Sequence, residues 1–73
     1  MSAEARTLTE KNGQELADWC GGILVAEHDA LDHSKTYPGI NLPLETGGVG
    51  RASVGDTIIK TNTGGFTISW KAP

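Results

Sequence analysis

Residues 57–71 decide the fold and read TIIKTNTGGFTISWK. The second half of this stretch alternates apolar and polar residues, which is the period of a half-buried β-strand. The apolar members of that alternation lie on one face: Phe66, Ile68 and Trp70. Residues 62–65, Asn-Thr-Gly-Gly, have the composition of a hairpin turn because Asn and Gly tolerate positive φ. The stretch therefore predicts a β-hairpin with strands over 57–61 and 66–71.

Near the start of the chain, residues 8–20 are predicted to form an amphipathic helix. Thr7 and Glu10 have the spacing of a capping box, in which each side chain binds a free backbone N–H of the first turn. Gly21 and Gly22 are expected to end the helix, because glycine adopts the left-handed conformation without steric cost. The apolar residues of this segment share one helical face: Leu8, Leu16, Trp19 and Cys20.

Between the helix and the hairpin, the sequence predicts short strands joined by polar loops. Residues 22–27 contain four consecutive apolar residues, which suggests a strand buried on both faces. Residues 28–38 are polar and are expected to form a long loop. Residues 39–44 alternate at period two, and Pro43 either ends that strand or places it at a sheet edge. A very short strand is expected over 49–52.

Together these elements predict an α+β fold in one domain spanning residues 1–73, with residues 1–6 frayed. One N-terminal helix packs on a small, mostly antiparallel sheet of four to five short strands that ends in the β-hairpin. The core is expected to form from Leu16, Trp19, Cys20, Ile23, Val25, Ile58, Phe66, Ile68 and Trp70.

Length, charge and cysteine content exclude several classes of protein. A chain of 73 residues is too short for a two-domain enzyme or a nucleotide-binding α/β fold. The net charge is −3 and the six basic residues are scattered, which argues against a nucleic-acid partner. No apolar run reaches the length of about 18 residues that a membrane span needs, so we expect no membrane partner. The single cysteine, Cys20, forms no internal disulfide and indicates a reducing compartment.

The residues capable of catalysis form no recognised arrangement. Cys20 lies at the predicted end of the helix, where the helix dipole raises a thiol pKa, and we interpret it as a core residue. The glycine-rich residues 47–51 lack the Gly-Lys-Ser/Thr of a phosphate-binding loop. Asp56 follows Gly55 and is interpreted as a turn residue that bonds its own backbone. We therefore expect no catalytic residue, no cofactor and no enzymatic activity.

Residues 27–33, Glu-His-Asp-Ala-Leu-Asp-His, are the best candidate for a metal site. His28 and His33 are five residues apart, which fits no helical zinc pair, and the chain has no second cysteine. We interpret this segment as a solvated loop without a metal. A metal site and a pH-sensitive contact through its histidines are the alternatives.

The loop over 28–38 is also the best candidate for binding a partner, because long loops in small domains are often functional. Tyr37 is expected to be exposed there, and tyrosine commonly anchors protein interfaces. Arg51 either pairs with Glu45 or Asp56 or is presented to a partner. The candidate partner-binding residues are His33, Lys35, Tyr37 and Arg51.

Four short motifs occur in order along the chain: LAxWCGG over 16–22, PLExG over 43–47, RAxxGDxII over 51–59, and GF at 65–66. The ordered set resembles small accessory proteins encoded by bacteriophages and prophages of actinobacterial and other Gram-positive hosts. Most members of that group have no assigned function. Members usually continue past the last strand, whereas this sequence stops at Pro73.

The resemblance implies a phage protein that acts in the host cytoplasm. Because so small a domain displays a surface more readily than it encloses an active site, we expect non-catalytic binding. The expected partner is a host protein, which the phage protein would modulate, or whose defence function it would counter. The alternative is a self-assembling structural or virion assembly component, because a marginal core and a strand edge at 39–44 favour a homo-oligomer.

Overall fold

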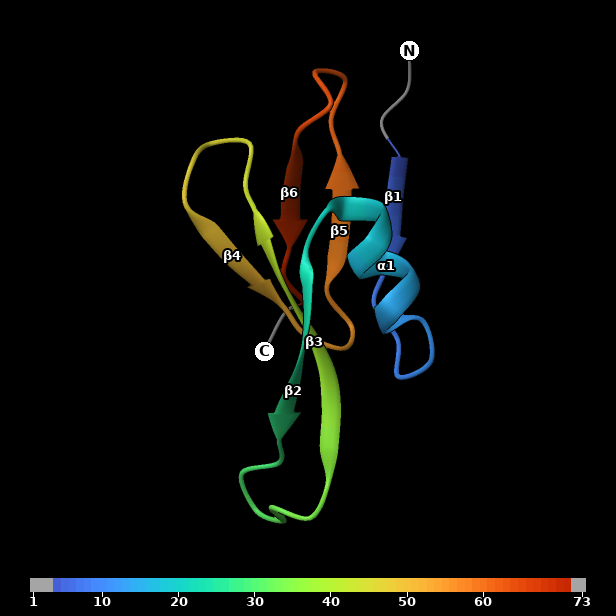
Figure 1. Ribbon diagram of the computed structural model, residues 1–73, viewed down its shortest axis with the longest axis vertical. Coiled ribbons are helices and arrows are strands. Elements are labelled where there is room, and N and C mark those ends of the chain that lie inside the picture. Colours follow the sequence, from blue (N-terminus) through green and yellow to red (C-terminus); the bar gives the residue numbers. More distant parts are fainter. Residues whose placement is uncertain (1–3, 72–73) are drawn as a thin grey trace.

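The structure is a computed structural model that describes residues 4–71 and shows one helix and six strands in an α+β arrangement (Figure 1). In chain order these are β1 (Glu4–Thr7), α1 (Gly13–Cys20), β2 (Ile23–His28), β3 (Thr36–Pro43), β4 (Val49–Ala52), β5 (Thr57–Lys60) and β6 (Phe66–Ser69). Every strand pair is antiparallel. The predicted α+β class and the predicted C-terminal hairpin are therefore confirmed.

The strands form two separate three-stranded sheets, in the orders β1-β5-β6 and β2-β3-β4. The prediction of a single sheet of four to five strands was therefore wrong. Side chains fill the space where β4 and β6 approach each other. A Cβ built on Gly50 would lie 2.9 Å from Cδ1 of Ile68 and 3.0 Å from the methyl groups of Leu44. The two sheets consequently meet through side chains and not through a shared hydrogen-bond ladder.

The first strand was not expected, because residues 1–6 were predicted to be frayed. Residues 4–7 pair with β5, and the register sets Glu4 opposite Lys60. The hydroxyl groups of Thr7 and Thr57 are hydrogen-bonded across this pair at 2.9 Å. Residues 1–3 lie outside the described part of the chain. Residues 4–7 have no apolar alternation of their own. Their strand conformation therefore depends on pairing with β5, about 50 residues further along the chain.

Helix α1 begins at Gly13, five residues later than predicted, and the capping box does not form. Asn12 organises the preceding segment instead: its Oδ1 accepts a hydrogen bond from the Thr9 N–H (2.7 Å), and its Nδ2 donates to the Thr7 carbonyl (3.0 Å). Leu8 is buried in this extended segment, and its backbone N–H donates to the Asp56 carbonyl at 2.9 Å. Residues 8–12 therefore stay outside the helix, because Leu8 is buried when this segment is extended.

The predicted C-terminal end of the helix is confirmed. Gly21 has φ of 67°, the left-handed conformation, and the Gly22 N–H donates to the Ala17 carbonyl. Gly22 also permits a close approach to β3, because a Cβ there would lie 2.7 Å from the Asn41 carbonyl oxygen and 2.7 Å from Cγ2 of Ile40.

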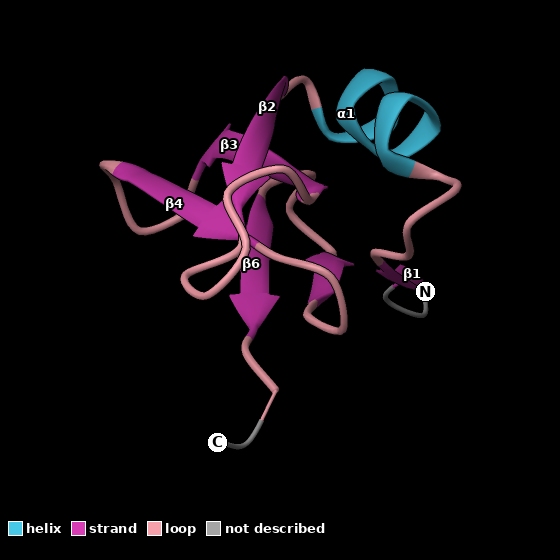
Figure 2. Cartoon of the chain, turned by 90° about the horizontal axis from the view of Figure 1, so that it is seen from below, coloured by secondary structure: helices cyan, strands magenta, loops and turns pink. Residues whose placement is uncertain are grey.

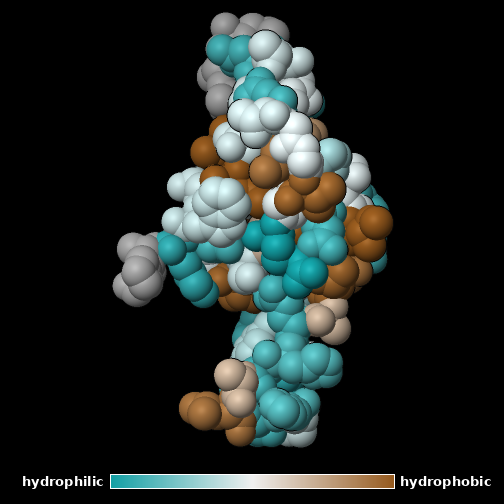
Figure 3. Space-filling model, turned by 90° about the vertical axis from the view of Figure 1, so that its left-hand side faces the viewer, coloured by the Kyte–Doolittle hydropathy of each residue, from teal (hydrophilic) through white to brown (hydrophobic). Residues whose placement is uncertain are grey.

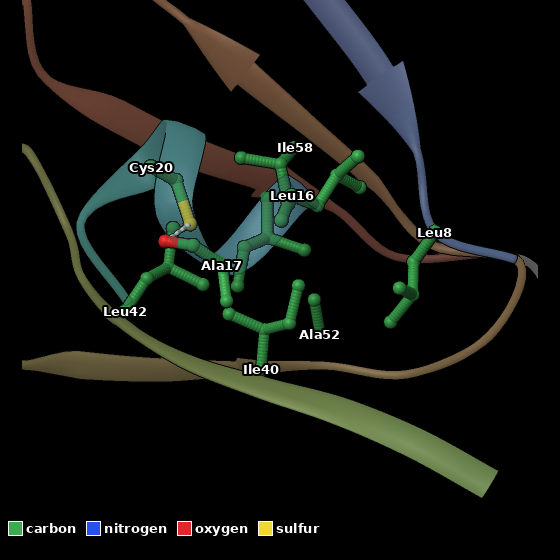
Figure 4. Packing of buried hydrophobic residues seen from close by; sticks show 9 residues of the cluster. Leu8, Leu16, Ala17, Cys20, Ile40, Leu42, Ala52 and Ile58 are labelled. Atoms are coloured by element: carbon green, nitrogen blue, oxygen red, sulfur yellow. Dashed lines mark hydrogen bonds between the residues drawn. The ribbon is translucent and has the colours of Figure 1, made fainter. Parts of the chain in front are cut away.

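The core lies between α1 and the two sheets (Figure 4). Its buried members are Leu8, Leu16, Ala17, Cys20, Ile40, Leu42, Ala52, Ile58 and Ile68. Trp19 and Phe66 pack against this cluster with their rings edge to face. Two predicted core residues are exposed instead, Ile23 by 68% and Trp70 by 59%. Ile23 lies on the edge strand β2, and Trp70 follows the end of β6.

The β2–β3 hairpin extends well beyond this core and gives the molecule its elongated shape of 42 × 23 × 23 Å (Figure 1). The last pair between β3 and β4 is Ile40 with Ala52, so β3 pairs only with β2 past that point. We call residues 25–39 the arm. Seen from the end of the arm, α1 lies to one side of the strands (Figure 2). The predicted loop over 28–38 was too long, because β2 continues to His28 and β3 begins at Thr36.

Candidate partner-binding arm

The tip of the arm, residues 29–35, is an ordered turn. Asp29 Oδ1 accepts hydrogen bonds from the backbone N–H groups of Leu31 (2.8 Å) and Asp32 (3.2 Å). Asp32 Oδ1 accepts bonds from the Ser34 N–H (3.1 Å) and the Ser34 hydroxyl (2.6 Å). The Asp29 N–H donates to the Lys35 carbonyl, which closes the hairpin. Two consecutive carboxylate-capped turns therefore fix the backbone of the tip.

These hydrogen bonds also affect the charge of the tip. The bond from the Leu31 N–H, followed by that from the Asp32 N–H, lowers the pKa of the Asp29 carboxyl below its ordinary value. The Ser34 hydroxyl, followed by the Ser34 N–H, lowers the pKa of the Asp32 carboxyl in the same way. Donors that bind the ionised form favour it. Both carboxylates consequently remain charged at neutral pH, where they order the tip.

Leu31 is the most exposed large apolar residue of the described chain, at 98%. It stands between the two capping carboxylates, so the turn presents it to solvent. Figure 3 shows the arm as a largely hydrophilic extension that ends in hydrophobic atoms, while most other hydrophobic residues in this view gather over the body. Leu31 was not among the predicted partner-binding residues. The pattern Asp29-x-Leu31, in which an aspartate caps the N–H two residues on, would have predicted its place at a turn.

Of the four predicted partner-binding residues, His33 and Lys35 lie in the exposed tip. Tyr37 was predicted to be exposed in a loop, and this prediction was wrong. It lies in β3, half-buried and opposite Glu27, with its hydroxyl 3.5 Å from Asp29 Oδ2. Its ring is therefore part of the arm's framework more than of its contact surface.

Arg51 lies on β4 at the opposite end of the β2–β3 hairpin from the tip, opposite Asn41. Its Nη1 forms an ion pair with Glu27 Oε2 at 3.3 Å, and its Nε donates to Asn41 Oδ1. The Ser53 hydroxyl donates to the same Glu27 oxygen at 3.1 Å. The predicted pairing of Arg51 with Glu45 or Asp56 was wrong, and the structure does not bring Arg51 together with the tip residues.

Asp56 and Glu45 have other partners. Asp56 is buried and accepts hydrogen bonds from the backbone N–H groups of Ser53 and Lys71, both at 2.8 Å, which confirms its prediction as a turn residue. Glu45 accepts hydrogen bonds from the Thr63 and Thr61 hydroxyl groups, which lower the pKa of its carboxyl. Each carboxylate thus fixes a turn of the body.

Cys20 is buried, and its Sγ lies 3.8 Å from the Ala17 carbonyl oxygen. Burial raises the pKa of this thiol, so it stays protonated at neutral pH. Within residues 4–71, no group of three or more His, Cys, Asp or Glu side chains is placed to hold a metal ion. In the same part of the chain, no helix has the length and apolar character to cross a membrane.

A hollow of about 230 Å³ lies at the base of the arm. It is lined by Glu10, Glu27, Tyr37, Ser53, Val54 and Lys71. Its charged groups are largely engaged with neighbours, because Glu27 is bound by Arg51 and Lys71 Nζ donates to the Val54 carbonyl at 2.6 Å. The hollow therefore lies at the junction between the arm and the body, where Glu27 and Lys71 are already bonded within the chain.

Comparisons with protein-family models, with curated proteins and with solved structures gave no match to this chain.

Proposed function

We propose that this chain is a phage-encoded, non-catalytic protein that acts in the host cytoplasm and docks on a host protein through its arm. The observation that carries the proposal is the ordered tip, which holds Leu31 at 98% exposure on a projecting hairpin. The phage origin and the host rest on the sequence motifs alone.

The arm has the features of a preorganised contact. The carboxylates of Asp29 and Asp32 fix the turn before any partner arrives, so docking costs little ordering entropy at the tip. His33 and Lys35 lie in the same exposed tip as Leu31 and would supply polar contacts around this apolar anchor. Such an arrangement suits stoichiometric binding. Binding would modulate the host protein or counter its defence function.

Affinity capture from an actinobacterial host lysate tests this function. Leu31→Ser removes the apolar group at the tip, and Val49→Ser removes an exposed apolar group of the body as a matched control. We expect one host protein to be captured by the wild-type chain and by the Val49→Ser variant, and to be lost with Leu31→Ser. Retention with Leu31→Ser, or equal loss with both variants, would contradict the role of the arm.

A second candidate is the self-assembling structural component, which the exposed apolar residues of the body favour. Ile23, Val49 and Trp70 are all more than half exposed, and burial between copies would remove them from water. Light scattering at several concentrations distinguishes the two functions, since a strict monomer would leave self-assembly without support.

A further inference from the structure

We propose that the outer edge of β2 is a docking site for an extended, basic segment of a protein partner. That segment would add to the sheet β2-β3-β4 as a fourth strand. The inference rests on the proposed function, because it specifies how the arm and its base engage a partner and what chemistry the partner carries.

The register of the hairpin identifies the backbone groups on this edge. In an antiparallel pair, residues that exchange backbone hydrogen bonds alternate with residues that do not. The Asp29 N–H donates to the Lys35 carbonyl at 3.1 Å, and the register of β2 on β3 continues from this pair. Pro38 lies opposite Ala26, in a pair that exchanges no backbone hydrogen bonds. The missing N–H of proline therefore costs no bond between β3 and β2. The alternation directs the N–H and C=O groups of three residues away from β3: Leu24, Ala26 and His28.

Each of the other three edge strands, β1, β4 and β6, accepts a hydrogen bond from a group outside its own sheet. On β1, the Thr7 carbonyl accepts a hydrogen bond from Asn12 Nδ2 at 3.0 Å. On β4, the Arg51 carbonyl accepts one from the Trp70 indole at 3.0 Å. On β6, the Phe66 carbonyl accepts one from the backbone N–H of Glu45 at 2.7 Å.

No hydrogen bond within residues 4–71 reaches the outward backbone of β2 from outside its hairpin. The strand also lacks the lysine or proline that commonly protects a sheet edge, and its first four residues are Ile-Leu-Val-Ala. A row of unpaired donors and acceptors on an apolar strand is the feature that recruits an added strand.

The surface beside this edge is suited to the side chains of an incoming strand. A shallow hollow of about 300 Å³ is lined by Leu24, Val25, Ala26, Thr36, Tyr37 and Pro38. Ile23 and Leu24, at the base of the arm, are exposed by 68% and 40%. Alternate apolar side chains of an added strand would cover these groups, while its backbone would bond to β2.

The charge of the arm determines the kind of partner. Residues 25–39 contain the carboxylates of Glu27, Asp29 and Asp32 and the single ammonium group of Lys35, a net charge of −2 in a chain of net charge −3. Glu27 is paired with Arg51, so Asp29 and Asp32 at the tip are the carboxylates left to attract a basic partner. A segment that carries lysine or arginine therefore complements the arm. A second copy of this chain does not complement the charge of the arm. An antiparallel β2 centred on Ala26 would set Glu27 opposite Val25 and Asp29 opposite Ile23, so neither carboxylate would face a positive charge.

The test uses selection from a displayed library of random dodecapeptides against the full chain, followed by affinity measurement with labelled peptides. The Ala26→Pro variant removes one outward N–H of β2 and keeps the bonds to β3. The Ala5→Pro variant is the matched control, because Ala5 lies on the edge strand β1 of the other sheet, outside the arm, and directs its N–H away from β5. Amide exchange of the wild-type complex gives a second readout that is independent of how either variant folds.

We expect the selected peptides to alternate β-branched residues with lysine or arginine. They should bind the wild-type and Ala5→Pro chains equally and the Ala26→Pro chain at least about tenfold more weakly. Binding should slow the exchange of the Ala26 and His28 amides. Absence of enrichment, acidic peptides, unchanged affinity for Ala26→Pro, or unchanged amide exchange would each overturn the proposal.

Two outcomes separate this inference from the proposed function. Self-association that Ala26→Pro abolishes would assign the edge to a second copy and overturn the basic partner. A host complex that depends on Leu31 but not on Ala26 would leave the proposed function standing and overturn the edge.

Discussion

The body and the arm are stabilised by different interactions. The body buries Leu16, Ile40 and Ile58 between the helix and the two sheets, so its stability comes from apolar area removed from water. The arm has backbone pairing along β2 and β3 and carboxylate caps at its tip, with little apolar burial. The proposed partner contact therefore lies apart from the residues that stabilise the fold, and mutation should be able to separate the two.

The largest expected effect is loss of a core side chain. Leu16→Ala should lower the free energy of unfolding by about 2–5 kcal/mol, because it removes a fully buried side chain and leaves a cavity. Chemical denaturation followed by circular dichroism measures this change. A loss below about 1 kcal/mol would mean that the core is not the main source of stability.

A smaller loss is expected from Asp56→Ala. The change leaves the backbone N–H groups of Ser53 and Lys71 without their acceptor and should cost about 1–3 kcal/mol. The control is Asp18→Ala, which removes an exposed helix carboxylate bonded to Gln14 and should cost less than about 0.5 kcal/mol. Equal costs for the two variants would show that the turn at Asp56 does not depend on its carboxylate.

Acidification should affect the arm locally. The pKa values of Asp29 and Asp32 are lowered in the folded chain, so their contribution is fully present above the ordinary carboxyl value of 3.8. It is lost as the pH falls through their lowered folded values. In an NMR titration, the amide signals of Leu31 and Ser34 should therefore shift with midpoints below 3.8. Midpoints at or above that value would contradict the capped turns.

The smallest effect on stability is expected from Leu31→Ser at the tip. Because Leu31 is 98% exposed, the free energy of unfolding should change by less than about 0.5 kcal/mol. Thermal melts of this variant and of the wild-type chain measure the difference. A large loss of stability would show that the tip contributes to folding, and the proposed separation of arm and body would fail.

Local patterns predicted part of the fold. The alternation of Phe66 and Ile68 predicted the last strand of the C-terminal hairpin, and the alternation of Ile40 and Leu42 predicted the strand β3. Gly21 predicted the end of the helix. In each case, the residues that carry the signal are close in sequence to the structure they specify.

Features that depend on distant partners were not predictable in the same way. Strand β1 has no periodic signal and forms only because β5 pairs with it. Trp70 continues the apolar alternation of β6, yet its indole lies against the Arg51 carbonyl and it stays exposed. For the candidate site, His33 and Lys35 were correctly expected in an exposed loop, whereas Tyr37 was expected there and lies in β3. Arg51 lies in the short strand expected over 49–52, but its ion-pair partner is Glu27 and not Glu45 or Asp56, because such partners depend on cross-strand neighbours.

The turn at Asp56 has a consequence for how the chain folds during synthesis. The Leu8 N–H donates to the Asp56 carbonyl, and the Lys71 N–H donates to the Asp56 carboxylate, so segments from both ends of the described chain meet at one turn. Strand β1 emerges from the ribosome before β5 and has no sheet partner until β5 follows. Completion of the sheet β1-β5-β6 thus joins residues 4–7 with residues 57–69, and contacts of such long sequence separation slow folding. The β2–β3 hairpin, with a short connection, can pair before β5 is synthesised.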